Sequence, residues 1–383
     1  MPLFLLVTRY VGLVTLTAFF HVTAFPQVVI HPTSENIPDP SDPRFELRHG
    51  LDGDESWEWD SLEMSSIGVN EGSLSQMLGF VFDLKTDHNG TIYYFDIVHQ
   101  EVRAYDYRGN WISSVGSPGT GPGELASPLG LAVVSERNQV IIADQFINHI
   151  FERKDSSFQL VATQRPIYPS INGRMCAMDE HYYLVSFNNT ETSSKMGLIH
   201  KYTLEGEWVT SFGNSYDYDD PFVVSEFAYN TSLACNSEYQ TIAFVTRGIP
   251  AMTGYSDQGE KLWQVTFPGH RPITTKEHWE NGRKYLTENR DDGTSAFGPL
   301  FSDGEYFYVV YVFAQKESRF HFFSKPKLSG GHAFRVHAQT GLGIYLGSSG
   351  PEPGEILRAI DGEYRFTTTE TSGFPQIRIY KSQ

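Results

Sequence analysis

Cysteine is scarce in this chain, which has only two among its 383 residues, Cys176 and Cys235. They form no Cys-x-x-Cys pair, so the sequence supports neither a thiol redox motif nor a zinc site built from thiolates. In an oxidising compartment the two side chains could pair. Both lie in short apolar stretches, however, which we expect to be inner strands of neighbouring repeat units. We therefore prefer two buried, unpaired thiols that pack as small apolar side chains.

Positive charge is also in short supply. The chain has 29 Lys and Arg residues against 46 Asp and Glu residues, and its formal net charge is −17. A strongly acidic chain repels phosphate, so we expect no nucleic-acid partner and no binding to an anionic membrane surface. A basic partner or a cation remains open.

The common catalytic motifs are missing. The sequence has no His-x-x-x-His or His-Glu-x-x-His pair, no Gly-x-Ser-x-Gly nucleophile elbow and no Gly-x-x-x-x-Gly-Lys-(Ser/Thr) phosphate loop. We therefore predict no metal site, no catalytic residue and no cofactor. None of the 13 histidines opens a predicted inner strand, and these six fall in predicted loops or outer strands: His149, His270, His278, His321, His332 and His337.

The apolar segment at the N-terminus is short for a membrane span, which needs about 20 apolar residues. Arg9 is the only charge in residues 1–24, Tyr10–Phe20 is apolar, and Val22-Thr-Ala24 is typical of a cleavage site. We expect residues 1–24 to be a signal peptide. The alternative is an uncleaved membrane anchor formed by residues 2–24. Residues 25–54 are rich in Pro, Asp and Ser, which indicates an extended lead-in.

Glycine and proline, by contrast, gather at one repeated join. A Gly/Pro-rich loop, Gly116–Glu124, is followed by the apolar stretch Leu129–Val134, which is typical of a strand buried on both faces. The join recurs as Gly347–Ile356, and Pro-Gly-Glu-(Leu/Ile) begins at Pro122 and again at Pro353. Five units of about 46 residues would span that separation, which is a typical period for propeller blades.

A second motif repeats without gaps. Tyr105–Gly116 matches Tyr202–Gly213 at Tyr, Gly, Trp, Ser and the final Gly, and looser copies are Tyr255–Trp263 and Val336–Gly347. The pattern predicts a third strand, a tight turn that needs Gly, and a fourth strand. We expect its Trp to cover the hairpin where one unit meets the next. Asp96 and Asp144 follow second strands, and we expect both to accept hydrogen bonds from their own turns.

Aromatic residues make up 14% of the chain, which favours β structure. We predict an all-β fold over residues 55–383: one six-bladed β-propeller with four-stranded antiparallel blades. The last blade would be Ile356–Tyr380 closed by the N-terminal strand Trp57–Gly68, so that no sheet edge stays exposed. Residues 270–292 are a polar insertion between the fourth and fifth blades, and the composition of Thr275–Arg290 favours a helix. The first five predicted blades are Leu74–Gly121, Pro122–Pro169, Ser170–Tyr218, Asp219–Gly269 and Gly293–Gly350.

One blade carries a family resemblance. Gly116–Phe151 combines the Gly/Pro-rich loop with Pro128-x-Gly-Leu-Ala-Val, Ile142-Ala-Asp144 and Asn148-His149, and it resembles an NHL repeat. The chain is similar to exported bacterial six-bladed propellers of the NHL-repeat and TolB-like type, although Ile150 stands where that family usually has Arg. The resemblance implies two further possibilities: a zinc-dependent lyase acting on peptidyl-hydroxyglycine, and a lactonase-like calcium site, for which Glu226, Asn172 and Asn230 lie near inner strands.

The function we predict is non-catalytic binding outside the cytoplasm, in the periplasm or after secretion. The ligand would be a protein, peptide or glycan, held on one face or at the central channel mouth, where pockets of radial folds form. The alternative is a metal-dependent propeller hydrolase or lyase. We expect a monomer. The residues that we place near the channel mouth, as ligand-binding candidates, are Asn172, Arg174, Glu226, Tyr229 and Arg358.

Overall fold

The computed structural model describes residues 61–73, 75–187, 197–213, 228–229, 231–246, 251–267, 274–280, 283–289, 295–314, 328–369 and 373–382. The predicted signal peptide, the lead-in at residues 25–54 and the residue Glu226 lie outside the described residues. No described segment forms a helix with the length and hydropathy of a membrane span.

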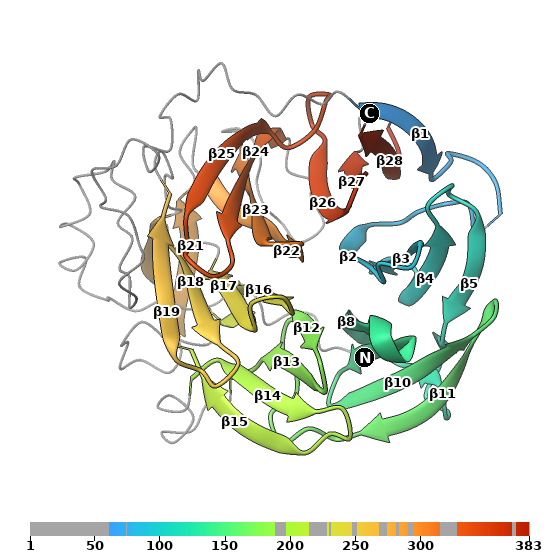
Figure 1. Cartoon of the computed structure of the whole chain (residues 1–383), viewed down its shortest axis with the longest axis horizontal. Coiled ribbons are helices and arrows are strands. Elements are labelled where there is room, and N and C mark those ends of the chain that lie inside the picture. Colours follow the sequence, from blue (N-terminus) through green and yellow to red (C-terminus); the bar gives the residue numbers. More distant parts are fainter. Residues whose placement is uncertain are drawn as a thin grey trace.

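Six four-stranded antiparallel sheets stand around a common axis (Figure 1). The first strand of each sheet lies nearest the axis and the fourth lies at the rim. This is a six-bladed β-propeller, as the repeats predicted. Blades 1 to 3 are formed by β2 (Val81–Thr86), β3 (Thr91–Asp96), β4 (Glu101–Asp106) and β5 (Trp111–Val115); by β8 (Pro128–Val134), β9 (Gln139–Asp144), β10 (Ile147–Lys154) and β11 (Ser157–Gln164); and by β12 (Met175–Met178), β13 (His181–Val185), β14 (Ile199–Thr203) and β15 (Trp208–Phe212).

Two short elements lie between the regular blade strands, and the strands of blades 4 and 5 follow them along the chain. The parallel bridge β6–β7 (Ser117–Pro118 and Glu124–Leu125) lies within the Gly/Pro-rich join, and a 3-10 turn covers Ser135–Arg137. The remaining blade strands are β16 (Thr231–Asn236), β17 (Thr241–Thr246), β18 (Ala251–Ser256) and β19 (Lys261–Thr266) in blade 4, and β22 (Ser295–Asp303), β23 (Tyr306–Ala314), β24 (Leu328–His337) and β25 (Gly343–Ser348) in blade 5.

Blade 6 is shared between the two ends of the described chain. It contains β26 (Ile356–Asp361), β27 (Tyr364–Thr369), β28 (Gln376–Ser382) and, at the rim, β1 (Ser61–Ile67). β1 pairs antiparallel with β28, with Ile67 opposite Ile377. The predicted closure by an N-terminal strand is confirmed. It gives the last sheet its fourth strand and joins both ends of the described chain in one blade.

The role expected of the repeated Trp holds in one copy only. Trp263 is fully buried, and its Nε1 donates a hydrogen bond to the Ala338 carbonyl of the next blade at 2.8 Å. It stands opposite Gly254, where any side chain would collide with the indole. Trp111 and Trp208 stand opposite Tyr105 and Tyr202 instead, and are 41% and 39% exposed. Trp111 and Trp208 follow their turn glycines Gly109 and Gly206 by two residues, whereas Trp263 follows Gly259 by four and so occupies a different position of the hairpin.

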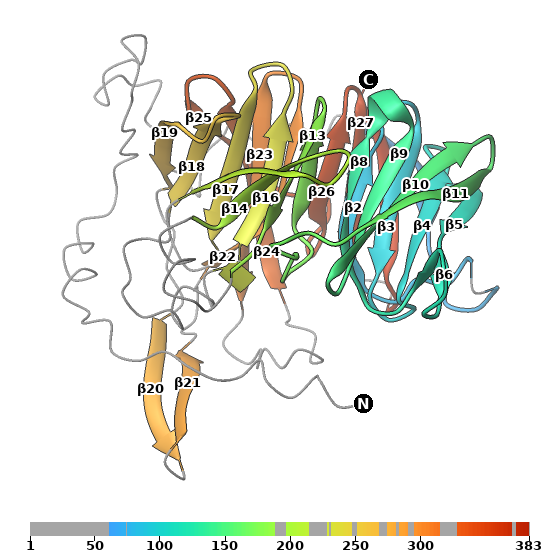
Figure 2. The ribbon, with the colours of Figure 1, turned by 90° about the horizontal axis from the view of Figure 1, so that it is seen from below.

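The predicted helix in the insertion is wrong. The segment forms a hairpin of β20 (Thr274–Glu280) and β21 (Arg283–Asn289), which projects beyond one face of the disc (Figure 2). The pairing of Glu280 with Arg283 leaves two residues between the strands, Asn281 and Gly282. Asn-Gly is the strongest short hairpin signal in a sequence. It outweighs the helix-favouring composition of the flanking residues.

The preference for unpaired thiols is also wrong. Cys176 in β12 and Cys235 in β16 form a disulfide. Both lie on inner strands of neighbouring blades, as expected, and their Cα atoms are 5.6 Å apart, which is within the range that a disulfide spans. The bond cross-links blades 3 and 4 close to the central axis.

The alternating strand directions give the disc two different faces. One face, here the turn face, carries the turns between first and second strands and between third and fourth strands. The other, here the loop face, carries the connections between second and third strands and between successive blades. The β20–β21 hairpin belongs to the loop face, because it lies in the connection between blades 4 and 5.

Candidate functional site: a cationic channel beneath the loop face

A small pocket lies in the central channel, between the inner strands of five of the six blades. Its walls come from β2, β16, β22 and β26, and from Arg174, which directly precedes β12. Three of its side chains are cationic and one is a carboxylate: Lys85, Arg174, Arg358 and Asp83. The pocket therefore attracts anions. It is lined by Phe82, Asp83, Leu84, Lys85, Arg174, Ser232, Leu233, Pro299, Leu300 and Arg358.

Asp83 is the centre of the charged group. It is 6% exposed, and its Oδ1 lies 3.3 Å from Nη1 of Arg174 and 3.6 Å from Nζ of Lys85. Its other oxygen, Oδ2, is buried and has no hydrogen-bond donor. The Arg174 guanidinium also lies over the Phe82 ring, 4.5 Å from its centroid. Such a cation–π contact and ion pair hold the Arg174 head in place.

Arg174 is positioned by the two residues before it. The Asn172 side-chain amide donates to the carbonyls of Ala228 and Thr231 at 2.9 and 3.0 Å, and its Oδ1 accepts from the Arg174 backbone N–H at 2.9 Å. Gly173 has a φ of +72° and packs so closely on Leu129 that a Cβ would lie 2.0 Å from the Leu129 carbonyl oxygen. Asn172 thus links the segment before β12 to blade 4, and Gly173 lets the same segment approach blade 2.

The structure brings together two of the five predicted ligand-binding residues, Arg174 and Arg358, in the pocket. Arg358 Nε also donates to Thr368 Oγ1 at 2.8 Å. Asn172 is 9% exposed and makes the bonds to blade 4 described above, so its place in the structure is that of a support for Arg174. Tyr229 is 49% exposed, on the loop face. Glu226, together with Asn230 of the suggested calcium set, lies outside the described residues.

Sequence reasoning missed Asp83 and Lys85. The signal was present, because both are charged and lie two residues apart in a segment expected to be an inner strand, where alternate side chains share a face. A buried inner strand rarely carries charged residues unless they are paired.

Exposed apolar side chains distinguish the loop face around this channel. They come from the connections of four blades and from the segment that follows β1, and they are 38–70% exposed. The turn face differs, because its first turns carry exposed acidic residues in five blades. The apolar set consists of Val69, Phe80, Val98, Phe146, Ile167 and Tyr229, and the acidic set of Glu136, Asp179, Glu180, Glu238, Glu305 and Glu363.

A second polar cluster lies on the turn face, where blades 5, 6 and 1 meet. His88 Nδ1 is 2.9 Å from Asp361 Oδ1, and Tyr107 donates to the other oxygen of Asp361. The hydrogen bond to Asp361 outweighs burial and raises the pKa of His88. Burial opposes ionisation of Asp361, but the bonds from His88 and Tyr107 prevail and lower its pKa. Burial and the nearby Asp361 raise the pKa of Asp303.

Three of these residues, His88, Asp303 and Asp361, have ligand atoms within 4.8 Å of one another. Their hydrogen bonds link three blades at the closure of the ring, and we assign them that structural role. They lie at the far ends of the inner strands from Arg174, so they are not part of the channel pocket.

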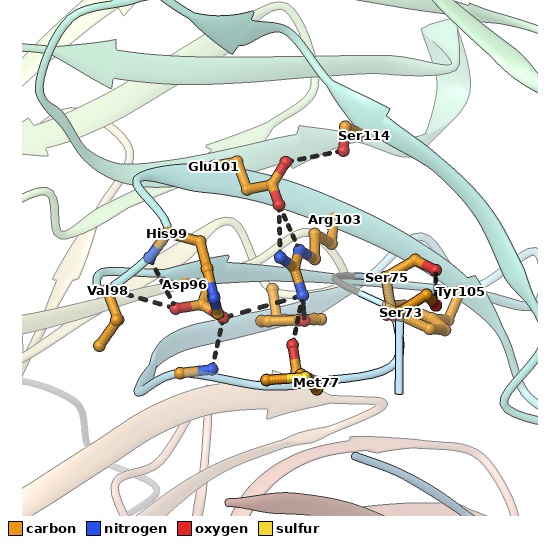
Figure 3. A network of polar contacts seen from close by, with 12 residues as sticks. Ser73, Ser75, Met77, Asp96, Val98, His99, Glu101, Arg103, Tyr105 and Ser114 are labelled. Atoms are coloured by element: carbon orange, nitrogen blue, oxygen red, sulfur yellow. Dashed lines mark hydrogen bonds and ion pairs between the residues drawn. The ribbon is translucent and has the colours of Figure 1, made fainter. Parts of the chain in front are cut away.

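A buried network in blade 1 fixes the connection from β1 to β2 (Figure 3). Asp96 accepts hydrogen bonds from the backbone N–H groups of Val98 and His99, as predicted, and also from Gly79 at 2.7 Å. The fully buried Arg103 donates to Glu101 at 2.6 Å and to the Met77 carbonyl at 2.8 Å. These bonds tie the segment before β2 to the inside of the blade, so we assign the network a structural role.

Asp144 repeats part of this arrangement in blade 2. It accepts hydrogen bonds from the backbone N–H groups of Ala126 and Ser127 at 2.7 and 2.5 Å. These donors precede the inner strand β8 and do not belong to the turn that follows Asp144. The prediction that Asp144 accepts hydrogen bonds from its own turn is therefore wrong, because its carboxylate binds the join that precedes β8 instead.

Comparison with known proteins supports the same architecture. Residues 81–219 match the model of the family DUF5128, described as a 6-bladed beta-propeller. The chain is a six-bladed β-propeller. No curated protein matches it. Among solved structures it is similar to a protein described as exported, from Bacteroides fragilis NCTC 9343, at 10% identity and a TM-score of 0.56, covering 84% of this chain and 95% of that one.

A member of the DUF4221 family from Bacteroides vulgatus is also similar in structure. It has 10% identity and a TM-score of 0.51, and the match covers 84% of this propeller and 97% of the other chain. At this level of identity the two solved structures support the fold alone.

Proposed function

We propose that this propeller is a non-catalytic binding protein that takes an apolar peptide segment of a protein partner on its loop face. One observation carries the proposal: six exposed large apolar side chains lie on the face that surrounds the cationic channel, while the first turns of the opposite face carry exposed acidic residues in five blades. Exposed apolar groups around a concave site mark a binding surface. The aliphatic residues Val69, Val98 and Ile167 suit peptide side chains, and this favours a peptide over a glycan.

The charges in the pocket favour binding over the alternative, a metal-dependent hydrolase or lyase. A catalytic metal at the channel would need anionic or neutral ligands such as carboxylates and histidines. The pocket instead carries the positive charges of Lys85, Arg174 and Arg358. Among the described residues that line the pocket, Asp83 is the only one with a carboxylate, and its Oδ1 is already shared by two cations.

We further propose that the protein acts outside the cytoplasm and belongs to the NHL-repeat and TolB-like type of exported propeller. Three features support this: the signal-like pattern of residues 1–24, the disulfide between Cys176 and Cys235, and the NHL-like segment Gly116–Phe151. The similar protein from Bacteroides fragilis is itself described as exported. Mass measurement of the chain recovered from a bacterial periplasm tests this, with a new N-terminus at Phe25 expected and retention of residues 1–24 opposing cleavage.

The binding proposal is tested with substitutions on the loop face and at the rim. Phe146 is 70% exposed on the loop face, whereas Val161 is 44% exposed on a rim strand of the same blade. Binding of a pool of acetylated tripeptides made from Leu, Phe, Val and Ala is followed by calorimetry. We expect Phe146→Ser to weaken binding by about tenfold, the effect of losing one buried aromatic contact, and Val161→Ser to leave it unchanged. Equal binding by both variants would contradict the proposal.

A further inference from the structure

Asparagine directly precedes glycine at three positions in the chain: Asn89-Gly90, Asn172-Gly173 and Asn281-Gly282. This dipeptide can deamidate without an enzyme, because the backbone nitrogen of the second residue can attack the side-chain carbonyl carbon of the Asn. Glycine permits the attack most readily, since it has no Cβ in the way and its backbone reaches many conformations. The third pair lies outside the described residues, and the structure places the first two in opposite environments.

The first pair is open to the reaction. Asn89 is exposed in the turn between β2 and β3, on the turn face. In the described part of the chain, no group forms a hydrogen bond with the side-chain amide of Asn89 or with the backbone N–H of Gly90. Gly90 has a φ of +92°, and a Cβ built there would have no atom within 4 Å. Both reacting groups are therefore free to approach each other.

The second pair is closed to the same reaction. The Asn172 side chain is buried, and its amide nitrogen donates to two backbone carbonyls of the segment before and at the start of β16. Its Oδ1 accepts a hydrogen bond from the Arg174 N–H, and the Gly173 N–H donates to Ser170 Oγ at 3.0 Å. The attacking nitrogen and the attacked amide can move only if these bonds break, which costs free energy in a buried site.

We propose that Asn89 is a site of spontaneous deamidation in the folded protein, whereas Asn172 is protected. The Gly90 nitrogen forms a bond with Cγ of Asn89, the bond from Cγ to the amide nitrogen breaks, and that nitrogen leaves as ammonia with the proton of the Gly90 N–H. Water then opens the resulting succinimide at either carbonyl. The product is an aspartate or an isoaspartate at position 89, and each carries one new negative charge.

The turn that changes is the one that supports the closure of the ring. Asp87 Oδ1 accepts hydrogen bonds from the Asn89 and Thr91 N–H groups at 2.8 and 2.9 Å. His88, between Asp87 and Asn89, binds Asp361 of blade 6 at 2.9 Å. An isoaspartate runs the main chain through its side chain, so it lengthens this turn by one carbon atom and shifts the groups on either side. We therefore expect the closure to weaken as the protein ages.

Peptide mapping by mass spectrometry tests the inference on the full chain. The folded protein is incubated at neutral pH, and the deamidated fraction at each Asn is followed over time. Asn89 should convert about a hundredfold faster than Asn172, because the reaction at Asn172 must first break several hydrogen bonds. Equal rates at the two positions in the folded protein would overturn the inference.

The same measurement at a urea concentration that unfolds the protein is the matched control. Both side chains are followed by Gly, so their rates should become similar once unfolding removes the hydrogen bonds around Asn172. If Asn172 still converts much more slowly than Asn89 in the unfolded chain, the difference does not come from the structure and the inference is wrong.

Urea unfolding of aged protein tests the effect on the ring. Wild-type protein that is aged until Asn89 has converted should unfold at a lower urea concentration than fresh protein. Asn89→Gln, aged in parallel, should keep its stability, because attack on the longer side chain must close a six-membered ring and is slow. Aged wild type with unchanged stability, or an equal loss in Asn89→Gln, would overturn the proposed effect on the closure.

Discussion

Arg174 and Asp83 form an ion pair across the channel, with Nη1 and Oδ1 3.3 Å apart, although they belong to blades 3 and 1 and blade 2 lies between them in the ring. Such a contact is possible only near the axis, where the inner strands converge. It joins second neighbours in the ring and places a fixed charge pair in the pocket.

Removing Asp83 should destabilise the fold. In Asp83→Asn, Arg174 and Lys85 lose their shared counter-charge in a largely buried site, and we expect the free energy of unfolding to fall by about 2 kcal/mol. Urea unfolding of Asp83→Asn, Arg174→Gln and the double variant measures the coupling. The double variant should be more stable than the sum of the single effects predicts. Additive effects would show that the two side chains do not interact.

The disulfide should contribute strongly to stability. It closes a loop with a sequence separation of 59, for which the chain-entropy model gives about 4 kcal/mol. The double variant Cys176→Ser/Cys235→Ser should unfold at correspondingly lower denaturant concentration. Dithiothreitol should destabilise the wild type and leave the double variant unchanged. If dithiothreitol does not change the stability of the wild type, or if the double variant is as stable as the wild type, the assignment of the disulfide is wrong.

The two environments of the repeated Trp give a matched pair of substitutions. Trp263→Ala removes a fully buried indole between blades 4 and 5 and should cost about 3–5 kcal/mol. Trp208→Ala changes a side chain that is 39% exposed and should cost about 1 kcal/mol or less. Chemical unfolding of both variants compares them. Similar losses would mean that the motif has one structural role after all.

The closure of the ring should depend on pH through His88 and Asp361. The raised pKa of His88 stabilises the fold below its ordinary value of 6.5, and this is lost as pH rises through the raised value. The lowered pKa of Asp361 stabilises the fold above its ordinary value of 3.8, and this is lost as pH falls through the lowered value. The pair is therefore most stabilising between those two values.

We expect His88→Gln to lower the free energy of unfolding more at about pH 5 than at an alkaline pH above the raised pKa, where His88 is neutral in both states. Asp87 and Asp303 also face His88 and raise its pKa, so Asp361→Asn should reduce the pH dependence without abolishing it. Urea unfolding at the two pH values measures this. An equal effect of His88→Gln at both would contradict the account.

The fold could be predicted from the sequence because its motifs repeat. The copies at Tyr105–Gly116 and Tyr202–Gly213 mark third and fourth strands, and the Pro-Gly-Glu join marks the start of a blade. The closing strand was predictable for a physical reason, because three strands at the C-terminus leave one sheet edge open. The residues flanking Asn281-Gly282 have a composition that favours a helix, but the Asn-Gly pair is the stronger local signal, so the predicted helix is wrong.

The site was less predictable because it depends on side chains from distant blades. Arg174 and Arg358 could be placed near the channel from their position at inner strands. Asp83 and Lys85 could not be paired with Arg174, since the crossing of the channel is a property of the closed ring. The disulfide between Cys176 and Cys235 could not be predicted either, because two neighbouring inner strands can place their side chains on the same side or on opposite sides.

A crystal structure of the full chain with the tripeptide pool would test the central claim most directly. The account predicts a peptide on the loop face in contact with Phe146. A peptide bound on the turn face or at the rim would contradict it.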